Sequence, residues 1–247
     1  MSHVTVTREA ARLTLALARP EKKNALTNAM YTALHEALEA AAEDAAVGVV
    51  VLTGAPGVFT AGNDLGDFMA NPPSGENSPV FRLLRALVNF PKPIVAAVDG
   101  PAVGIGTTAL LHCDFVVATP TTRFQMPFVK LGLVPEGGSS LLLPQLAGLQ
   151  RASEHLLLGE PFDATEAKAM GLVNRIVPAD ELLTTANHFA DAFAARPREA
   201  IRLAKALLRD RQRAELLETL GKEGAVFVER LSSPEAHAAF AAFFAKK

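Results

Sequence analysis

The chain has 247 residues, 49% apolar and 20% charged, a balance typical of a globular protein rather than a disordered or collagen-like one. Its formal net charge of -2 gives no global reason to expect nucleic acid as a partner. The single cysteine, Cys113, excludes an intramolecular disulfide, and no apolar run approaches the roughly 20 residues that cross a bilayer. With no signal-peptide pattern at the N-terminus, we expect a cytoplasmic protein with no membrane partner.

The N-terminal third predicts two strands, a helix and a third strand. Residues 4–7 (VTVT) and 12–19 (RLTLALAR) alternate apolar and polar side chains, which indicates a hairpin. Thr27 is placed to cap a helix in which apolar residues recur at three- and four-residue spacing. Residues 47–54 (VGVVVLTG) then form a buried strand closed by a Gly-Pro turn.

The middle of the chain alternates helices with strands rich in Val and Ile. After a long loop rich in Pro, Gly, Asn and Ser (71–79), we expect a helix over 81–90, a strand over 93–100, a short helix over 105–113 and a strand over 115–119. This alternation favours an α/β body with a parallel sheet. After about residue 149 the pattern becomes helical, broken at Pro178, Pro197 and the SSPE segment at 232–235.

A glycine-rich turn, GPAVGIGTTALL (100–111), follows a strand and opens a helix. Gly104, Gly106 and Ala109 fit the spacing of a dinucleotide fingerprint, but that fingerprint needs an acid about 20 residues on. No Asp or Glu occurs from Phe115 to Pro135, so a nicotinamide site is disfavoured. Backbone N–H groups at this helix start could still face an oxyanion, or the glycines could serve a tight turn without a ligand.

A second turn of this kind is VFTAGNDL (58–65), in which Asn63 and Asp64 have the character of helix-start residues. Amides near 63–65 could also face a ligand, and the alternative is an ordinary capped turn. Asp64 and Asp67 lack a nearby His or third acid at ligand spacing, so we expect no metal site.

Glu136 is the only acid between Asp114 and Glu154, and it lies in the apolar segment LVPEGGSSLLLP (133–144). A carboxylate there is either solvated at a helix start or held in a nonpolar pocket, where burial would raise its pKa and make it a stronger base. Nucleophilic hydrolysis is disfavoured because no G-x-S-x-G elbow occurs and Ser139 and Ser140 have no local base. For His112 a role in the core is favoured over a ligand role.

Five segments together resemble the enoyl-CoA hydratase/isomerase (crotonase) family: RPEKKNALT, VFTAGNDL, KPIVAAVDGPAVGIGTTALLHCDFVVA, FQMPFVKLGLVPEGGSSLLLPQLAG and FDATEAKAMGLVNRIV. The resemblance implies an α/β fold, a spiral of β-β-α turns over residues 1–196, with a helical C-terminal oligomerisation region at 197–247. It also implies an acyl-CoA thioester as substrate, with CoA part of that substrate and no separate cofactor. The expected assembly is a homotrimer or a hexamer made of two trimers.

The resemblance also assigns roles to the two glycine turns and to Glu136. In the family two backbone amides bind the thioester carbonyl, and by motif position these are the amides of Asn63 and Ile105. Family hydratases carry two glutamates whose positions correspond here to Thr108 and Phe128, so hydration of a double bond lacks its acids. The P-E-G-G-S-S pattern is instead similar to the peroxisomal-type Δ3,Δ2-enoyl-CoA isomerase branch, in which a single glutamate, here Glu136, is the base.

For the CoA part, the resemblance points to backbone in two segments and to basic groups for the phosphates. The expected CoA-binding residues are Lys22, Asn24, Ala25, Leu26, Ala61, Asp64 and Leu65, with Lys23, Lys246 and Lys247 as further candidates for the phosphates. The loop over 66–79 is expected to border the acyl pocket. Two alternatives stay open: another reaction of the family (hydration, dienoyl-CoA isomerisation or thioester hydrolysis), and a non-catalytic acyl-CoA-binding protein.

Overall fold

The computed structural model describes residues 3–245. Its strands are β1 (Val4–Glu9), β2 (Arg12–Leu17), β3 (Val49–Thr53), β4 (Ile94–Val98), β5 (Pro101–Val103), β6 (Phe115–Ala118), β7 (Arg123–Gln125), β8 (Phe162–Asp163) and β9 (Arg175–Ile176). Its α-helices are α1 (Asn28–Glu43), α2 (Leu65–Ala70), α3 (Pro79–Asn89), α4 (Ile105–Thr108), α5 (Ser139–Ala147), α6 (Leu149–Ser153), α7 (Ala164–Met170), α8 (Leu182–Ala194), α9 (Arg198–Leu231) and α10 (Pro234–Ala245). Short 3-10 helices cover Pro20–Lys22, Ala109–His112, Val129–Leu131 and Ala179–Glu181.

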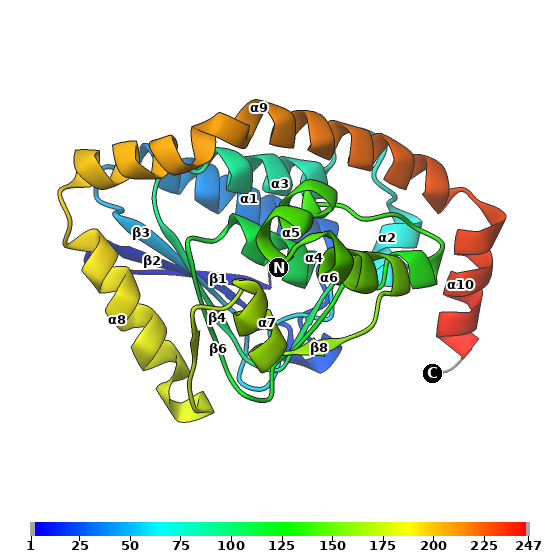
Figure 1. The fold of residues 1–247 in the computed structure, drawn as a ribbon, viewed down its shortest axis with the longest axis horizontal. Coiled ribbons are helices and arrows are strands. Elements are labelled where there is room, and N and C mark those ends of the chain that lie inside the picture. Colours follow the sequence, from blue (N-terminus) through cyan, green and yellow to red (C-terminus); the bar gives the residue numbers. More distant parts are fainter. Residues whose placement is uncertain (1–2, 246–247) are drawn as a thin grey trace.

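The main sheet has six strands in the order β1-β2-β3-β4-β6-β9. β1 and β2 form the predicted antiparallel hairpin, with Val4 opposite Leu17, and every later neighbour in this sheet pairs in parallel. β4 is buried along its whole length, which explains why its sequence is a continuous apolar run rather than an alternating one. A second sheet, β5-β7-β8, lies beside the first (Figure 1).

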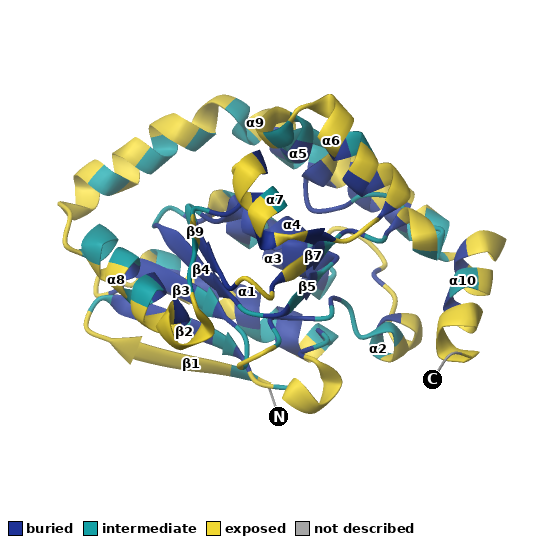
Figure 2. Ribbon diagram, turned by 60° about the horizontal axis from the view of Figure 1, so that its bottom comes forward, coloured by how far each residue is buried: buried dark blue, intermediate teal, exposed yellow. Residues whose placement is uncertain are grey.

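Helices cover both faces of the main sheet. Figure 2 shows that the inner strand β4 is buried, whereas β1 at the edge is exposed. One apolar cluster holds α1 and α3 against one face, and a second, with Val49 and Val95, holds α8 against the other. Thr27 caps α1 as predicted, because its side chain accepts a hydrogen bond from the Met30 N–H.

The long helix α9 crosses the molecule above α3, and α10 turns down at its end (Figure 1). The predicted breaks are present: Pro178 precedes a short 3-10 helix, Pro197 precedes α9, and α9 ends at Leu231 before α10 begins at Pro234. The division of the chain into a spiral core over residues 1–196 and a helical oligomerisation region over 197–247 stays a prediction. Across residues 3–245 no helix combines the length and the apolar character needed to cross a membrane.

Three expectations about elements need correction. The helix expected over 105–113 is α4 followed by a 3-10 helix, and it ends at His112. The region after residue 149 also contains the strands β8 and β9, which pair with β7 and β6. The segment 66–79 is not all loop, because α2 occupies its first part, started by Asp64, whose side chain accepts hydrogen bonds from the Gly66 and Asp67 N–H groups.

Candidate active site

The two glycine turns predicted from the sequence lie against each other. Thr60 pairs with Ala102 of β5. Gly62 has a φ of +82° and packs directly on the backbone of Val103, the residue after Ala102. A Cβ added to Gly62 would lie 2.7 Å from the Val103 carbonyl oxygen, closer than a real Cβ can approach, so only glycine fits this contact. The turn before α2 and the turn before α4 are thereby fixed side by side.

The Asn63 N–H lies between two backbone groups that pair with Leu26. The Gly62 carbonyl accepts from the Leu26 N–H at 2.8 Å, and the Asp64 N–H donates to the Leu26 carbonyl at 2.9 Å. Because backbone groups of an extended chain alternate in direction, the N–H of Asn63 between them points away from Leu26. Among residues 3–245 it has no acceptor.

The Ile105 N–H is the first of α4, whose preceding residue, Gly104, has a φ of 57°. The Gly104 carbonyl accepts hydrogen bonds from the Thr107 and Thr108 N–H groups and so closes the first turn of α4. The first N–H groups of a helix have no partner within the helix, and the Ile105 N–H has no acceptor in the described part of the chain. An amide N–H at a helix start is a donor suited to a negatively charged oxygen.

Glu136 is 6% exposed, and the hydroxyl of Thr108, which lies one turn after Ile105 in α4, donates to Glu136 Oε1 at 2.6 Å. The next two residues, Gly137 and Gly138, both have positive φ (71° and 74°) and turn the chain into α5. Phe128 and Leu133 are buried in the main apolar cluster. The burial expected for the Glu136 carboxyl group is therefore present.

Burial raises the pKa of Glu136 to about 8; the Thr108 hydrogen bond lowers it and the nearby Glu223 raises it further. A carboxyl group with such a pKa exchanges a proton near neutral pH, which suits a general base. Burial lowers the pKa of His112 to about 4, so that ring is neutral at pH 7. The pKa of Cys113 is raised to about 12 by burial, which makes it an unreactive thiol.

Three side chains at this site were not identified from the sequence as site residues. The Tyr31 hydroxyl donates to Asn63 Oδ1, the His112 ring contacts the Gly137 carbonyl, and Glu223 of α9 binds the turn after Glu136. His112 is 3% exposed, so its predicted place in the core is correct. Glu223 could have been identified from the sequence, because it lies on the buried face of α9 with Leu216, Leu220 and Phe227.

The two segments expected to bind CoA are paired with each other. The Ala61 N–H donates to the Lys23 carbonyl at 2.9 Å, and Leu26 bridges Asn63, so residues 22–26 and 61–65 form one continuous surface beside the glycine turns. Lys22 and Lys23 are exposed there, while Ala25 and Leu65 are partly exposed. Lys246 and Lys247 lie outside the described residues.

Asn24 and Asp64 have structural partners. Asn24 is fully buried, and its amide donates to the Val58 and Phe59 carbonyls, each at 3.0 Å. Although burial raises it, the pKa of Asp64 is lowered overall, chiefly by a hydrogen bond from Arg19 at 2.6 Å. Because both side chains already have partners, Asn24 and Asp64 could bind CoA only through their backbone groups, and this binding stays a prediction.

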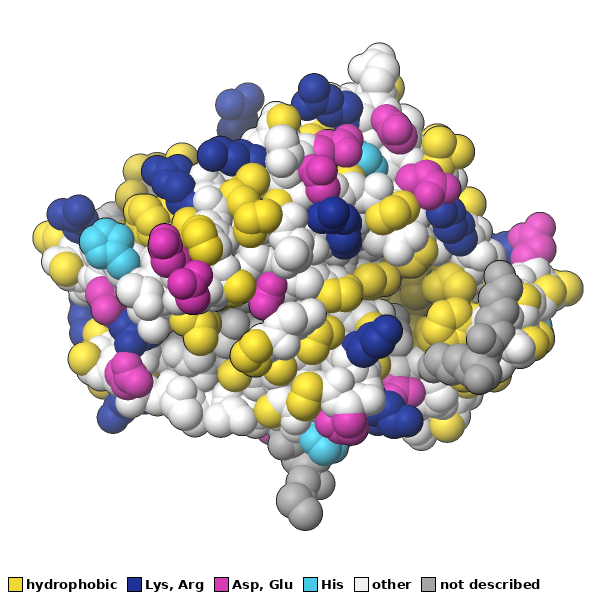
Figure 3. All heavy atoms as spheres, turned by 90° about the horizontal axis from the view of Figure 1, so that it is seen from below, with side chains coloured by type: hydrophobic (Ala, Val, Ile, Leu, Met, Phe, Trp, Pro, Cys, Tyr) yellow, Lys and Arg dark blue, Asp and Glu magenta, His cyan; other side chains and the backbone are white. Residues whose placement is uncertain are grey.

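Charges are mixed over the lower face of the molecule, where Figure 3 shows Lys and Arg interspersed with Asp and Glu. Apolar side chains gather in a hollow on the side where α10 lies. Within residues 3–245 no group of three or more His, Cys, Asp or Glu side chains is arranged to hold a metal ion.

Comparison with known proteins gives the family. A protein-family model described as enoyl-CoA hydratase/isomerase matches residues 7–247 of this chain. The chain belongs to this family. It is 36% identical to human enoyl-CoA delta isomerase 2 over 99% of its own length, but it spans only 64% of that relative. It is also 36% identical to 2,3-dehydroadipyl-CoA hydratase of Escherichia coli, covering 100% of this chain and 97% of the relative.

Solved structures agree on the fold. OdaA of Pseudomonas aeruginosa superposes with a TM-score of 0.96 at 47% identity, covering 98% of this chain and 99% of that one. An enoyl-CoA hydratase/isomerase of Pseudoalteromonas atlantica gives a TM-score of 0.94 at 40% identity, covering 100% and 98%. The predicted crotonase fold, with its helical C-terminal region, is therefore confirmed. The relatives include both isomerases and hydratases by name, so these names do not decide between the two reactions.

Proposed function

We propose that this member of the enoyl-CoA hydratase/isomerase family is an isomerase that moves the double bond of a 3-enoyl-CoA to the 2-position. The observation that carries the proposal is the buried carboxyl group of Glu136, bonded to Thr108 of α4, together with the N–H groups of Asn63 and Ile105, which have no acceptor among the described residues. The pKa of Glu136, raised to about 8, suits the removal and return of one proton. No second carboxylate is needed for this reaction.

In the proposed reaction the substrate carbonyl accepts hydrogen bonds from the Asn63 and Ile105 N–H groups. The Glu136 carboxylate removes a proton from C2, and the electrons of that C–H bond enter a dienolate whose charge rests on the carbonyl oxygen. Glu136 then returns the proton to C4, which leaves the double bond between C2 and C3. Preorganised amides stabilise such an oxyanion by several kcal/mol because they need not reorient.

Hydration is the second candidate, favoured by the identity to a 2,3-dehydroadipyl-CoA hydratase. Two residues argue against it. By the family pattern, hydratase glutamates correspond here to Thr108 and Phe128, and neither side chain can deprotonate water. Both are buried, and Thr108 already donates its hydroxyl hydrogen to Glu136. Burial around Glu136 also keeps out the water that hydration consumes.

The CoA moiety would lie along the paired segments 22–26 and 61–65, with Lys22 and Lys23 near its phosphates. A trimer or a hexamer is supported by exposed leucines, since large apolar side chains in contact with water mark interfaces. These include Leu207 and Leu208 of α9, which are 83% and 79% exposed, and Leu149, Leu157 and Leu158.

The test is the isomerisation of 3-enoyl-CoA, followed by the ultraviolet absorbance of the conjugated thioester, with wild type and Glu136→Gln side by side. We expect the variant to bind acyl-CoA but lose at least a thousandfold in kcat, since it cannot accept a proton. Wild-type turnover that persists in the variant contradicts the assignment. Loss of 2-enoyl-CoA in the same panel would indicate hydration, and release of free thiol would indicate thioester hydrolysis. Acyl-CoA binding without proton exchange at C2 in heavy water would indicate a non-catalytic protein.

A further inference from the structure

The peptide bond between Gly137 and Gly138 is held at both ends by buried side chains. The His112 Nε2–H donates to the Gly137 carbonyl at 2.8 Å, and the Gly138 N–H donates to Glu223 Oε2 at 2.6 Å. Because a carbonyl oxygen only accepts hydrogen bonds, the proton of the neutral His112 ring must be on Nε2. The two side chains come from the 3-10 helix at 109–112 and from α9, which are far apart in the sequence.

We propose that His112 and Glu223 are positioning residues that clamp the Gly137–Gly138 peptide and so fix the aim of the Glu136 carboxyl group. The proposal rests on the isomerase function proposed above, in which Glu136 is the base. Neither residue touches the reacting atoms in this scheme, and each acts through the turn.

A glycine pair needs such a clamp because it is the most flexible dipeptide a chain can contain. The site also excludes a stiffer pair. A Cβ on Gly137 would lie 2.8 Å from Thr108 Oγ1, and a Cβ on Gly138 would lie 2.4 Å from Leu216 Cδ1. Hydrogen bonds from outside therefore supply the rigidity that side chains at these positions cannot.

Glu223 is fully engaged at the start of α5. Its Oε1 accepts from the Ser140 N–H at 2.9 Å and from the Ser140 hydroxyl at 2.5 Å, while Oε2 is used by Gly138. Three donors converging on one carboxyl group favour its ionised form, against the burial that raises the pKa of Glu223. A negative charge on Glu223 raises the pKa of Glu136.

Three titratable groups face Glu136 or its turn: Tyr31 from α1, His112 from the 3-10 helix and Glu223 from α9. Burial first, then the charges of Glu136 and Asp67, raises the pKa of Tyr31 well above its ordinary value, so Tyr31 is neutral at pH 7. His112 is neutral there as well. Removal of the Glu223 charge should therefore lower the pKa of Glu136, whereas replacement of His112 should not.

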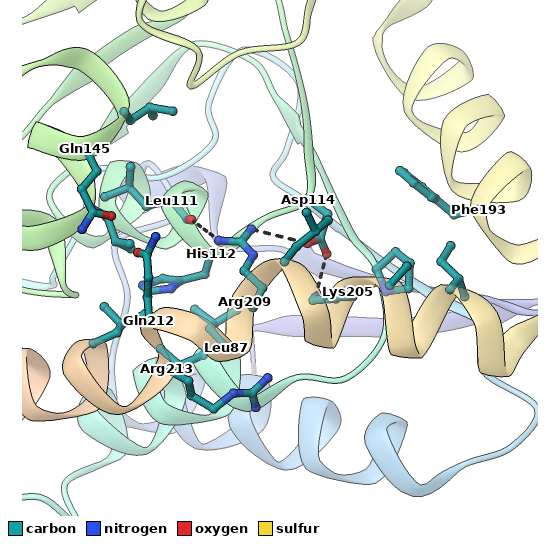
Figure 4. Close-up of a pocket in the computed structure, with 18 residues that line it drawn as sticks. Leu87, Leu111, His112, Asp114, Gln145, Phe193, Lys205, Arg209, Gln212 and Arg213 are labelled. Atoms are coloured by element: carbon teal, nitrogen blue, oxygen red, sulfur yellow. Dashed lines mark hydrogen bonds and ion pairs between the residues drawn. The ribbon is translucent and has the colours of Figure 1, made fainter.

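The two halves of the clamp are fastened to each other. Asp114, two residues after His112, forms ion pairs with Lys205 at 2.6 Å and with Arg209 at 3.4 Å, both on α9 (Figure 4). His112 and these charged residues line a pocket of about 610 Å³ whose other walls include α3, α5 and α9. The position of α9 and the position of His112 are thus tied through Asp114.

The test uses Glu223→Gln, His112→Phe and His112→Gln, with Glu218→Gln as the matched control. Glu218 lies on the same helix, but its side chain is 65% exposed and pairs only with Lys222 among the described residues. In Glu223→Gln an NH2 group must face one of the backbone N–H groups. We expect kcat to fall roughly ten- to hundredfold with KM changed less than threefold, because small misplacement of a catalytic group costs that much.

The pH dependence distinguishes positioning from a merely structural role. In Glu223→Gln the acidic limb of the kcat profile should move to lower pH, whereas His112→Phe should lower kcat without moving it. His112→Gln, whose amide nitrogen can reach the same carbonyl, should recover most of the activity that His112→Phe loses. Folded Glu223→Gln protein with the kcat and the acidic limb of wild type overturns the proposal, as does a loss of thermal stability alone.

A readout that needs no turnover separates this proposal from the isomerase function. The Glu136 carboxyl carbon can be titrated by NMR in protein labelled with 13C at the glutamate carboxyls and assigned by its loss in Glu136→Gln. If wild type fails to isomerise 3-enoyl-CoA, the proposed function is wrong. The clamp is still supported if Glu223→Gln lowers the Glu136 midpoint while Glu218→Gln does not, and an unmoved midpoint in folded Glu223→Gln refutes it.

Discussion

Replacement of Glu136 by Gln should stabilise the protein at alkaline pH. Burial raises the pKa of Glu136 from an ordinary 4.5 to about 8, so the folded state holds a proton that the unfolded chain has released between those values. The contribution of this group to stability is therefore full below pH 4.5 and is lost as pH rises through 8. A shift of this size corresponds to at most about 5 kcal/mol. Gln has no such dependence and can still accept the Thr108 hydrogen bond.

Urea denaturation of wild type and Glu136→Gln, at one protein concentration and at intervals from pH 4.5 to 9, measures the effect. The difference in the free energy of unfolding should be small at pH 4.5 and should reach several kcal/mol in favour of the variant at pH 9. Glu36→Gln, which removes an exposed carboxylate of α1, is the control and should show no such trend. A difference that stays flat across this range would refute burial as the cause of the raised pKa.

Three further variants test neighbouring contacts. Thr108→Val removes the hydrogen bond that lowers the pKa of Glu136, so the acidic limb of the kcat profile should move to higher pH and kcat at pH 7 should fall several-fold. Gly62→Ala forces a Cβ against the Val103 carbonyl, and we expect a loss of about 2 kcal/mol in denaturant stability together with a fall in kcat. Asp114→Asn leaves its two cationic partners on α9 unpaired, which should cost about 3 kcal/mol, while replacement of both partners by Met should recover part of it.

Long, regular elements could be predicted from the sequence. The hairpin at residues 4–17 followed from strict alternation, and β4 followed from a run buried on both faces. The strands β5, β7 and β8 were missed because segments of two or three residues carry no readable period. They pair with one another across distant parts of the chain, and Thr60 forms an isolated bridge to Ala102 of β5.

At the candidate site, the burial of Glu136 could be predicted because the information is local: an acid stands between a proline and two glycines in an apolar run. The roles of Glu136, Asn63 and Ile105 came from the family resemblance and stay predictions. The partners of Glu136 could not be predicted in this way, since 85 residues separate Gly138 from Glu223. A carboxylate on the buried face of a helix needs hydrogen-bond donors, and this need can be read from the sequence. Which groups donate is seen only in the folded chain.

The proposed use of two backbone N–H groups, those of Asn63 and Ile105, to bind a carbonyl oxygen also bears on how proteins of this fold diverge. A peptide N–H survives every amino-acid replacement except proline. Mutation can therefore exchange the reacting side chains one at a time while the grip on a carbonyl oxygen persists. Descendants of such a chain can acquire a new chemistry without an intermediate ancestor that has lost its means of stabilising an enolate.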